Sequence, residues 1–167
     1  REGKPVRIWG VNLSFAANFP THEDASRVAV RLAAAGVNSV RCHHMDTDKW
    51  PRGIWDDSGR DLHPEALDRQ DYFIAQLAEF GIYADVNLHV GKKYSTVLDI
   101  PESNTDYDKI VNLFMPELIE AQKTYARKLL THPNKYRDNM TYAEDYAVAI
   151  VEITNENSLF MWDAENT

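Results

Sequence analysis

The chain has 167 residues, of which 44% are hydrophobic and 26% are charged, and its formal net charge is −8. This composition is typical of a globular protein and excludes a fibrous or disordered chain. The sequence has neither a basic stripe nor an apolar run of about 20 residues, so we expect no nucleic-acid and no membrane partner. With Cys42 as its single cysteine, the chain cannot form an internal disulfide.

Short apolar runs alternate with longer segments of helical periodicity. The apolar runs predict strands at residues 6–13, 37–43, 82–89 and 147–154. Thr21 can cap a first helix, and Gly36 ends it. Pro64 and Pro116 fit the first turns of two further helices, the former ending at Gly81. This βαβαβαβ order predicts an α/β fold with parallel strands and helices packed outside them.

The third predicted strand has one apolar and one polar face. Its apolar residues are Ile82, Ala84, Val86 and Leu88, and they alternate with Tyr83, Asp85, Asn87 and His89. Alternate side chains of a strand point to opposite faces, so the apolar set should face the helices. The polar set needs an enclosed polar environment, such as the interior of a barrel below an active site. Two long strand-to-helix segments, residues 45–63 and 90–115, should lie together at one end of that barrel.

The sequence ends soon after the fourth predicted strand, whereas a complete (β/α)₈ TIM barrel takes ~250 residues. We therefore expect residues 1–167 to be the N-terminal half of a parallel (β/α)₈ barrel, supplying about the first four β/α units. A half barrel exposes strand edges and an apolar inner wall. The C-terminal half of the same barrel is accordingly the expected partner.

The segment Asn155-Glu156 ends the fourth predicted strand, where a carboxyl group would lie at the floor of the long-loop end. An isolated Asn-Glu pair more often belongs to a loop or a helix cap, but this position favours a site. Four segments in order resemble glycoside hydrolase family 5, the cellulase and mannanase family of clan A. They are RIWGVN at 7–12, GVNSVR at 36–41, GIYADVNLH at 81–89 and VEITNE at 151–156.

The resemblance implies a retaining glycoside hydrolase that acts on a β-linked glycan, a β-glucan or β-mannan, without a cofactor or metal. Glu156 would be the catalytic acid/base, and Asn155 would hydrogen-bond the 2-hydroxyl of the sugar. Arg41 would support the nucleophile, and His89 would line the subsite where the bond breaks. Further expected substrate-binding residues are His44, Asn12 and Trp162.

A retaining mechanism needs a second carboxylate about 5–5.5 Å from the first. In the family that residue follows the seventh strand, which lies beyond this sequence, so we expect the 167 residues alone to be inactive. The resemblance also favours a secreted or periplasmic location. Asn157 stands where many cellulases of the family carry proline, which leaves the identity of the sugar open.

Glu152 lies four residues before Glu156, on the same face of the predicted strand. A buried charge needs a partner, so we expect Glu152 to pair with Arg41 inside the barrel. Three predicted loop tryptophans either cover sugar faces or pack within the loops. They are Trp50, Trp55 and Trp162.

Two alternatives remain open at this stage. His43, His44, Asp46 and His89 have the chemistry of zinc ligands and would suit a metal-dependent barrel hydrolase. Adjacent histidines on a strand should point to opposite faces, which argues against a shared ion. The second alternative is a non-catalytic carbohydrate-binding barrel, which would bind sugar without turnover.

Overall fold

The computed structural model describes residues 5–95, 97–98 and 109–158. The strands are β1 (Gly10–Ser14), β2 (Ser39–His43), β3 (Tyr83–His89) and β4 (Val148–Thr154). The α-helices are α1 (His22–Ala34), α2 (Pro64–Glu79) and α3 (Pro116–Thr131). Two short 3₁₀ helices, η1 (Phe15–Asn18) and η2 (Val111–Leu113), follow β1 and precede α3. Each described helix is too short or too polar to cross a membrane.

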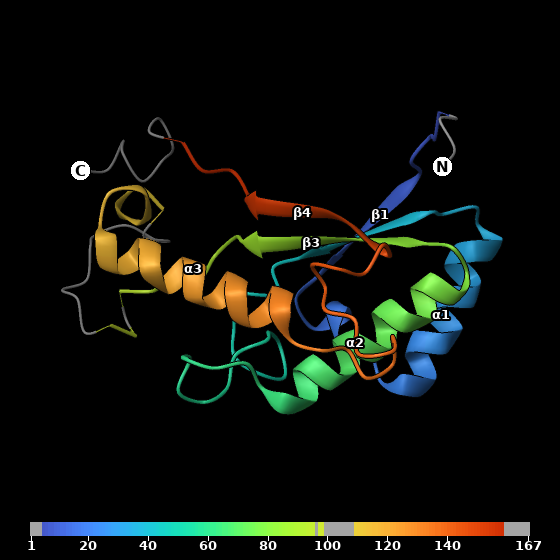
Figure 1. Ribbon diagram of the computed structural model, residues 1–167, viewed down its shortest axis with the longest axis horizontal. Helices are drawn as coiled ribbons and strands as arrows, with labels where there is room; N and C mark the ends of the chain where they lie inside the picture. The colour runs from blue at the N-terminus through green and yellow to red at the C-terminus, as the bar shows by residue number, and fades with distance from the viewer. Residues whose placement is uncertain (1–4, 96, 99–108, 159–167) are drawn as a thin grey trace.

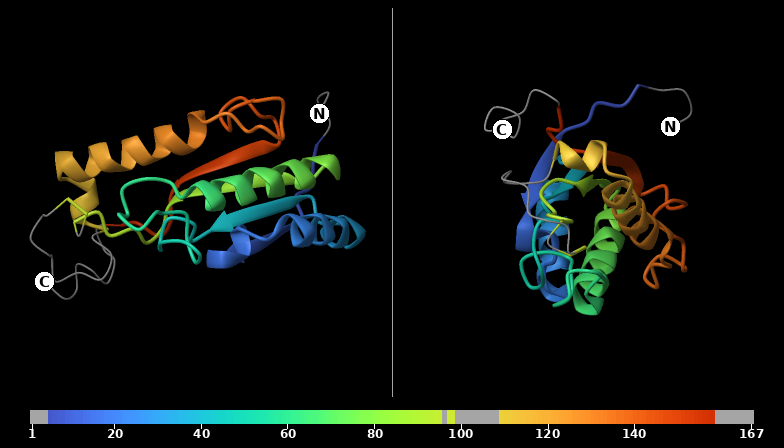
Figure 2. Two further views of the ribbon diagram at one scale, coloured as in Figure 1. Left: turned by 90° about the horizontal axis from the view of Figure 1, so that it is seen from below. Right: turned by 90° about the vertical axis from the view of Figure 1, so that its left-hand side faces the viewer.

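The strands form one parallel sheet in the order β1-β2-β3-β4. Figures 1 and 2 show that α1, α2 and α3 all lie on one side of this sheet, while its other side is open. Strands and helices thus alternate as the sequence predicted. Because all strands are parallel, their carboxyl ends lie at one end of the sheet, where the strand-to-helix segments begin.

Local sequence signals explain the helix boundaries. The Thr21 hydroxyl accepts a hydrogen bond from the backbone N–H of Asp24 at 3.1 Å, which caps α1. Prolines occupy the first turns of α2 and α3. Gly36 and Gly81 follow α1 and α2 with φ of +77° and +69°, a conformation that glycine adopts without strain. These features confirm the predicted helices.

The first strand is shorter than predicted. It begins at Gly10 and not at residue 6, because β2 begins at Ser39, the pairing partner of Gly10. Before this point a single backbone hydrogen bond, from Asn38 N–H to the Trp9 carbonyl at 3.0 Å, continues the ladder. The preceding residues therefore lack the partner strand that regular β structure requires.

The core lies between the sheet and the three helices. Ala84, Val86 and Leu88 of β3 are buried in it, against residues of all three helices. Asp85 and Asn87 lie on the open face, where they meet charged and polar groups of β2 and β4. The predicted division of this strand is confirmed for Asp85 and Asn87, whereas the ring of His89 is buried against Asn112, beside α3.

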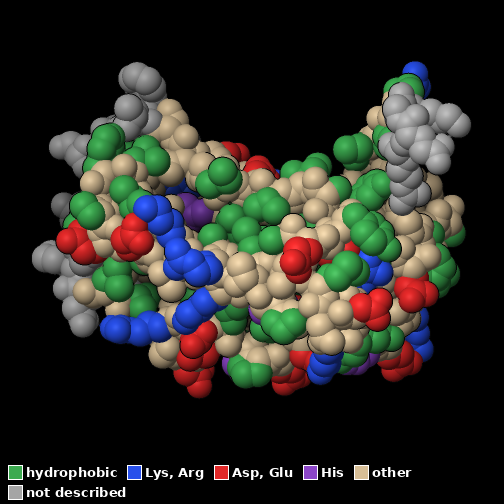
Figure 3. All heavy atoms as spheres, viewed as in Figure 1, with side chains coloured by type: hydrophobic (Ala, Val, Ile, Leu, Met, Phe, Trp, Pro, Cys, Tyr) green, Lys and Arg blue, Asp and Glu red, His purple; other side chains and the backbone are tan. Residues whose placement is uncertain are grey.

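Large hydrophobic side chains remain exposed at both edges of the sheet. On β4, Ile153 is 76% exposed, and Ile150 and Val151 are also exposed. Near β1, Ile8 and Trp9 are exposed as well. Figure 3 shows hydrophobic side chains along the hollowed upper surface above the sheet. Apolar surface gathered in this way is typical of an interface with further structure.

The long segment between α3 and β4 is anchored to α2. The side chain of Asp71 accepts a hydrogen bond from the Tyr142 hydroxyl at 2.7 Å and contacts His132 Nε2 at 2.7 Å. Asn134 donates to the Asp71 carbonyl at 3.0 Å. Arg137 makes a bidentate pair with buried Asp145 at 2.8 and 2.9 Å. This segment thus holds α2, α3 and β4 together.

The contact between His132 and Asp71 predicts a pH-dependent stability. Burial alone would lower the pKa of His132, but the hydrogen bond and charge of Asp71 raise it overall. The folded state therefore binds the proton more tightly than the unfolded state. The stabilisation is fully present below the unfolded pKa of about 6.5, and it is lost as pH rises through the raised folded pKa.

Urea unfolding between about pH 5 and pH 9 measures this effect, with H132N as the comparison. The wild-type protein should lose more stability than H132N as pH rises across this window. Parallel pH profiles for the two proteins would contradict the assignment.

Candidate functional site

Arg41 joins all four strands at the open face of the sheet. Its Nε and Nη2 donate to the two carboxylate oxygens of Glu152 on β4, at 2.7 and 2.9 Å. Its Nη1 lies 3.3 Å from Asn12 Oδ1 on β1, and its Nη2 lies 3.4 Å from Asn87 Oδ1 on β3. The predicted pairing of Glu152 with Arg41 is confirmed. Such a bidentate pair fixes the plane of the guanidinium.

The charges around Arg41 shift the pKa of two groups. The hydrogen bond to Glu152 raises the pKa of Arg41, so the guanidinium stays charged. Burial raises the pKa of the Asp85 carboxyl, and the negative charge of Glu152 adds to this effect, while Arg41 opposes it. The open face thus holds two carboxyl groups, Asp85 and Glu152, around one strong cation.

Asn155 and Glu156, which follow β4, lie close to Arg41. Arg41 Nη2 donates to Asn155 Oδ1 at 2.8 Å, and the backbone N–H of Asn155 donates to the His89 carbonyl at 2.8 Å. Glu156 is exposed, and its charge contributes to raising the pKa of Arg41. The structure therefore gathers Asn12, Arg41, Asn155 and Glu156 at the carboxyl edge of the sheet.

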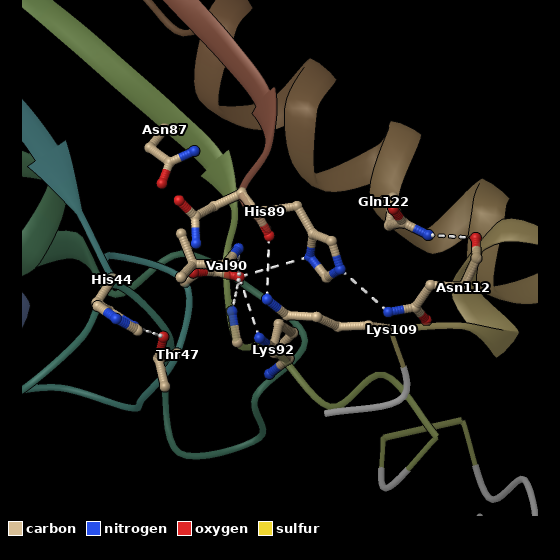
Figure 4. A network of polar contacts seen from close by, with 12 residues as sticks. His44, Thr47, Asn87, His89, Val90, Lys92, Lys109, Asn112 and Gln122 are labelled. Atoms are coloured by element: carbon tan, nitrogen blue, oxygen red, sulfur yellow. Dashed lines mark hydrogen bonds and ion pairs between the residues drawn. The ribbon is translucent and has the colours of Figure 1, made fainter. Parts of the chain in front are cut away.

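His89 ends β3 and is only 3% exposed. Its Nε2 lies 3.0 Å from Asn112 Nδ2, and its Nδ1 lies 3.5 Å from Asp46 Oδ2, beyond hydrogen-bond geometry. Figure 4 shows the ring between the end of β3 and Asn112. The backbone carbonyl of His89 contacts Asn155, whereas its side chain is enclosed below that turn.

Asp46 is a residue whose role the sequence did not reveal. This fully buried carboxylate accepts hydrogen bonds from the backbone N–H groups of Val90, Gly91 and Lys92 at 2.9, 3.1 and 3.0 Å. Burial would raise the pKa of Asp46, but His89 and the N–H groups lower it overall. Asp46 therefore ties the loop after β2 to the loop after β3.

The loop after β3 approaches the loop after β2 very closely. A Cβ added at Gly91 would lie 2.8 Å from Thr47 Oγ1, so this approach requires glycine. Gly91 lies two residues after the end of β3, and a glycine at this position is the local signal by which sequence reasoning could have found the contact.

The prediction for the two adjacent histidines, His43 and His44, is wrong. They were expected on opposite faces of a strand, but the ring centroids of His43 and His44 lie 4.2 Å apart. The strand ends at His43, and the left-handed backbone of His44, with φ 55°, turns its side chain back. The His44 ring stacks on Phe15 at 4.5 Å and its Nδ1 lies 2.9 Å from Thr47 Oγ1.

The four residues considered as metal ligands have other partners. His43 Nδ1 lies 2.7 Å from Asn87 Oδ1, and the contacts of His44, Asp46 and His89 are those given above. Over the described ranges, no group of three or more His, Cys, Asp or Glu side chains is placed to hold one metal ion. The geometry thus offers no support for the metal-dependent alternative.

The tryptophans differ in their surroundings. Trp55 is 3% exposed and donates from its indole N–H to the Asp46 carbonyl at 2.6 Å, so it packs within the loops. Trp50 is partly exposed and stacks on His63 at 5.2 Å. Trp162, an expected substrate-binding residue, lies outside the described residues.

Comparison with known proteins gives likenesses in structure only. No family model matches the sequence, and neither does any curated protein. The endo-1,4-β-mannanase of Rhizomucor miehei is similar in structure, with a TM-score of 0.74, 21% identity, and coverage of 92% of this chain and 45% of that one. The endo-β-1,4-mannanase of Thermotoga petrophila matches with a TM-score of 0.74 at 21% identity, covering 93% and 36%.

A glycoside hydrolase family 5 mannosidase of Rhizomucor miehei, in complex with mannosyl-fructose, matches with a TM-score of 0.74 at 14% identity. That match covers 95% of this chain and 46% of the mannosidase. The chain thus spans less than half the length of these solved proteins. The likeness confirms the predicted fold class: the described residues have the architecture of the first four strands of a parallel (β/α)₈ TIM barrel.

Proposed function

We propose that this chain is the N-terminal half of the catalytic domain of a retaining glycoside hydrolase, resembling family 5, that acts on a β-mannan. The arrangement of Arg41, Asn155 and Glu156 at the carboxyl edge of the sheet carries the proposal. In a (β/α)₈ barrel this edge holds the active site. The choice of β-mannan over β-glucan follows from the mannanases and the mannosidase among the similar structures.

In this proposal Glu156 gives its proton to the glycosidic oxygen as the bond to the sugar breaks. A carboxylate in the other half of the barrel attacks the sugar carbon and forms a covalent intermediate. The Glu156 carboxylate then takes a proton from a water molecule, which displaces the enzyme carboxylate from the sugar. Asn155 donates a hydrogen bond to the 2-hydroxyl, and Arg41 supports the charge of the nucleophile. Asn12 and His44 belong to the sugar-binding surroundings, whereas buried His89 supports the turn at Asn155 through its backbone carbonyl.

The exposed edges of the sheet support the domain assignment. The hydrophobic side chains of β4, and those near β1, would be covered by the next strand and helix of a closed barrel. The remaining half of the barrel is therefore the protein partner in this proposal, and the carbohydrate is the ligand.

Hydrolysis of β-mannan tests the proposal, with the complete natural polypeptide compared with residues 1–167 alone. The complete polypeptide should release sugars with retained anomeric configuration, which NMR detects. The 167-residue chain should be inactive because it lacks the nucleophile. Turnover by the short chain would contradict the half-barrel assignment. Mannan binding without hydrolysis by the complete polypeptide would favour a non-catalytic carbohydrate-binding barrel.

A further inference from the structure

The backbone of Glu156 adopts a left-handed conformation, with φ 47°. Residues other than glycine rarely adopt it, because Cβ then approaches the following carbonyl oxygen. Such a conformation persists only where the surrounding structure holds it, and it often marks a functional position. The turn formed by Asn155 and Glu156 therefore needs contacts that hold it.

Lys109 supplies such contacts from a distant part of the sequence. Its Nζ donates to the Asn155 carbonyl at 3.0 Å and also lies 3.4 Å from the Glu156 carbonyl. Lys109 is only 4% exposed. Figure 4 shows its side chain extended beside the ring of His89, with the ammonium directed toward the ends of β3 and β4. A buried ammonium stays near its hydrogen-bond acceptors, because moving away would leave its N–H donors buried without them.

Among the described residues, two other contacts hold Asn155, and neither of them involves Glu156. The His89 carbonyl accepts from the Asn155 N–H, and Arg41 donates to the Asn155 side chain, both at 2.8 Å. Lys109 adds a hydrogen bond to the Asn155 carbonyl and extends to the carbonyl of Glu156 itself. It thus connects the loop before η2 to the backbone that orients the Glu156 side chain.

We propose that Lys109 is a positioning residue that holds the Asn155–Glu156 turn and so directs the Glu156 carboxyl toward the bond to be cleaved. The inference rests on the proposed function, in which Glu156 is the acid/base. Lys109 acts through the backbone and does not touch the substrate. A displacement of about 1 Å in a reacting group can cost on the order of 10²-fold in rate. K109M should therefore lower kcat about 10²-fold, with little change in KM, and K109R should restore much of the loss.

Hydrogen exchange tests whether Lys109 holds the turn, without any need for activity. The complete polypeptide is compared with K109M, K109R and K123M. Lys123 is exposed and pairs with Glu120 on α3 at 2.6 Å, which makes K123M a matched control. Backbone amides of residues 154–158 should exchange faster in K109M, stay close to wild type in K109R and be unchanged in K123M. Unchanged exchange in K109M would overturn the inference, whether or not the protein hydrolyses glycans.

A double-mutant cycle with E156Q tests whether Lys109 acts through Glu156. Groups that act as one catalytic unit give strongly non-additive losses in kcat. K109M should lower kcat strongly in the wild-type background and little in the E156Q background. An equal factor in both backgrounds would overturn the positioning role and indicate a general structural one. Absence of hydrolysis by the wild-type polypeptide would instead refute the proposed function, and hydrogen exchange would still decide whether Lys109 holds the turn.

Discussion

Replacing Glu156 with glutamine should lower kcat of the complete polypeptide on β-mannan by about 10²–10⁴-fold, the usual contribution of a general acid/base. Glutamine keeps the size of the side chain and its hydrogen-bonding capacity, but it cannot deliver a proton to the departing oxygen. The fold should be unaffected, because Glu156 is exposed. Initial rates of reducing-sugar release, together with far-ultraviolet circular dichroism, measure both effects.

The matched control for this experiment is E79Q, which replaces an exposed glutamate at the end of α2. Its activity should equal that of the wild type. If E156Q retained wild-type kcat on β-mannan, Glu156 would not be the acid/base and the proposed mechanism would be wrong.

Replacing Asp46 with alanine should destabilise the protein by about 3 kcal/mol or more. The substitution leaves three buried N–H groups, those of Val90, Gly91 and Lys92, without their acceptor. Each unsatisfied buried donor costs about 1–3 kcal/mol, although partial relaxation or entering water reduces the sum. The midpoint of urea unfolding measures the loss.

Asp48 provides the control, because it is partly exposed and pairs with exposed Arg52 at 3.2 Å. D48A should change stability by no more than about 1 kcal/mol. A D46A protein as stable as D48A would show that the loop anchor contributes nothing. The lowered pKa of Asp46 also predicts a pH dependence of the free energy of unfolding. The stabilisation by Asp46 should be present above about pH 4 and be lost as pH falls through the folded pKa.

The sheet and helices were predictable because their signals are local and periodic. Alternation along β3 assigned its two faces, and prolines and glycines marked the helix boundaries. Alternation along the fourth strand placed the Glu152 side chain inside the barrel, where it was expected to pair with Arg41. The structure confirms that pair. The first strand was predicted too long because its length depends on where β2 begins, which hydropathy alone does not reveal.

Much of the site depends on loop conformation, which periodicity does not report. Asp46 is anchored by amides of another loop, so its local sequence carries no sign of that role. His44 follows the end of β2 and has a left-handed backbone conformation, so the alternation of side chains along a strand does not apply to it. Lys109 reaches the Glu156 turn from a segment without helix or strand signals.

The dependence of the rate on the leaving group shows whether Glu156 protonates the departing oxygen. The measurement compares E156Q with wild type on β-mannan and on a dinitrophenyl β-mannobioside, whose leaving group needs no proton. E156Q should be strongly impaired on β-mannan but should release the first equivalent of dinitrophenolate at nearly the wild-type rate. Equal impairment on both substrates, or impairment on neither, would contradict the acid role of Glu156.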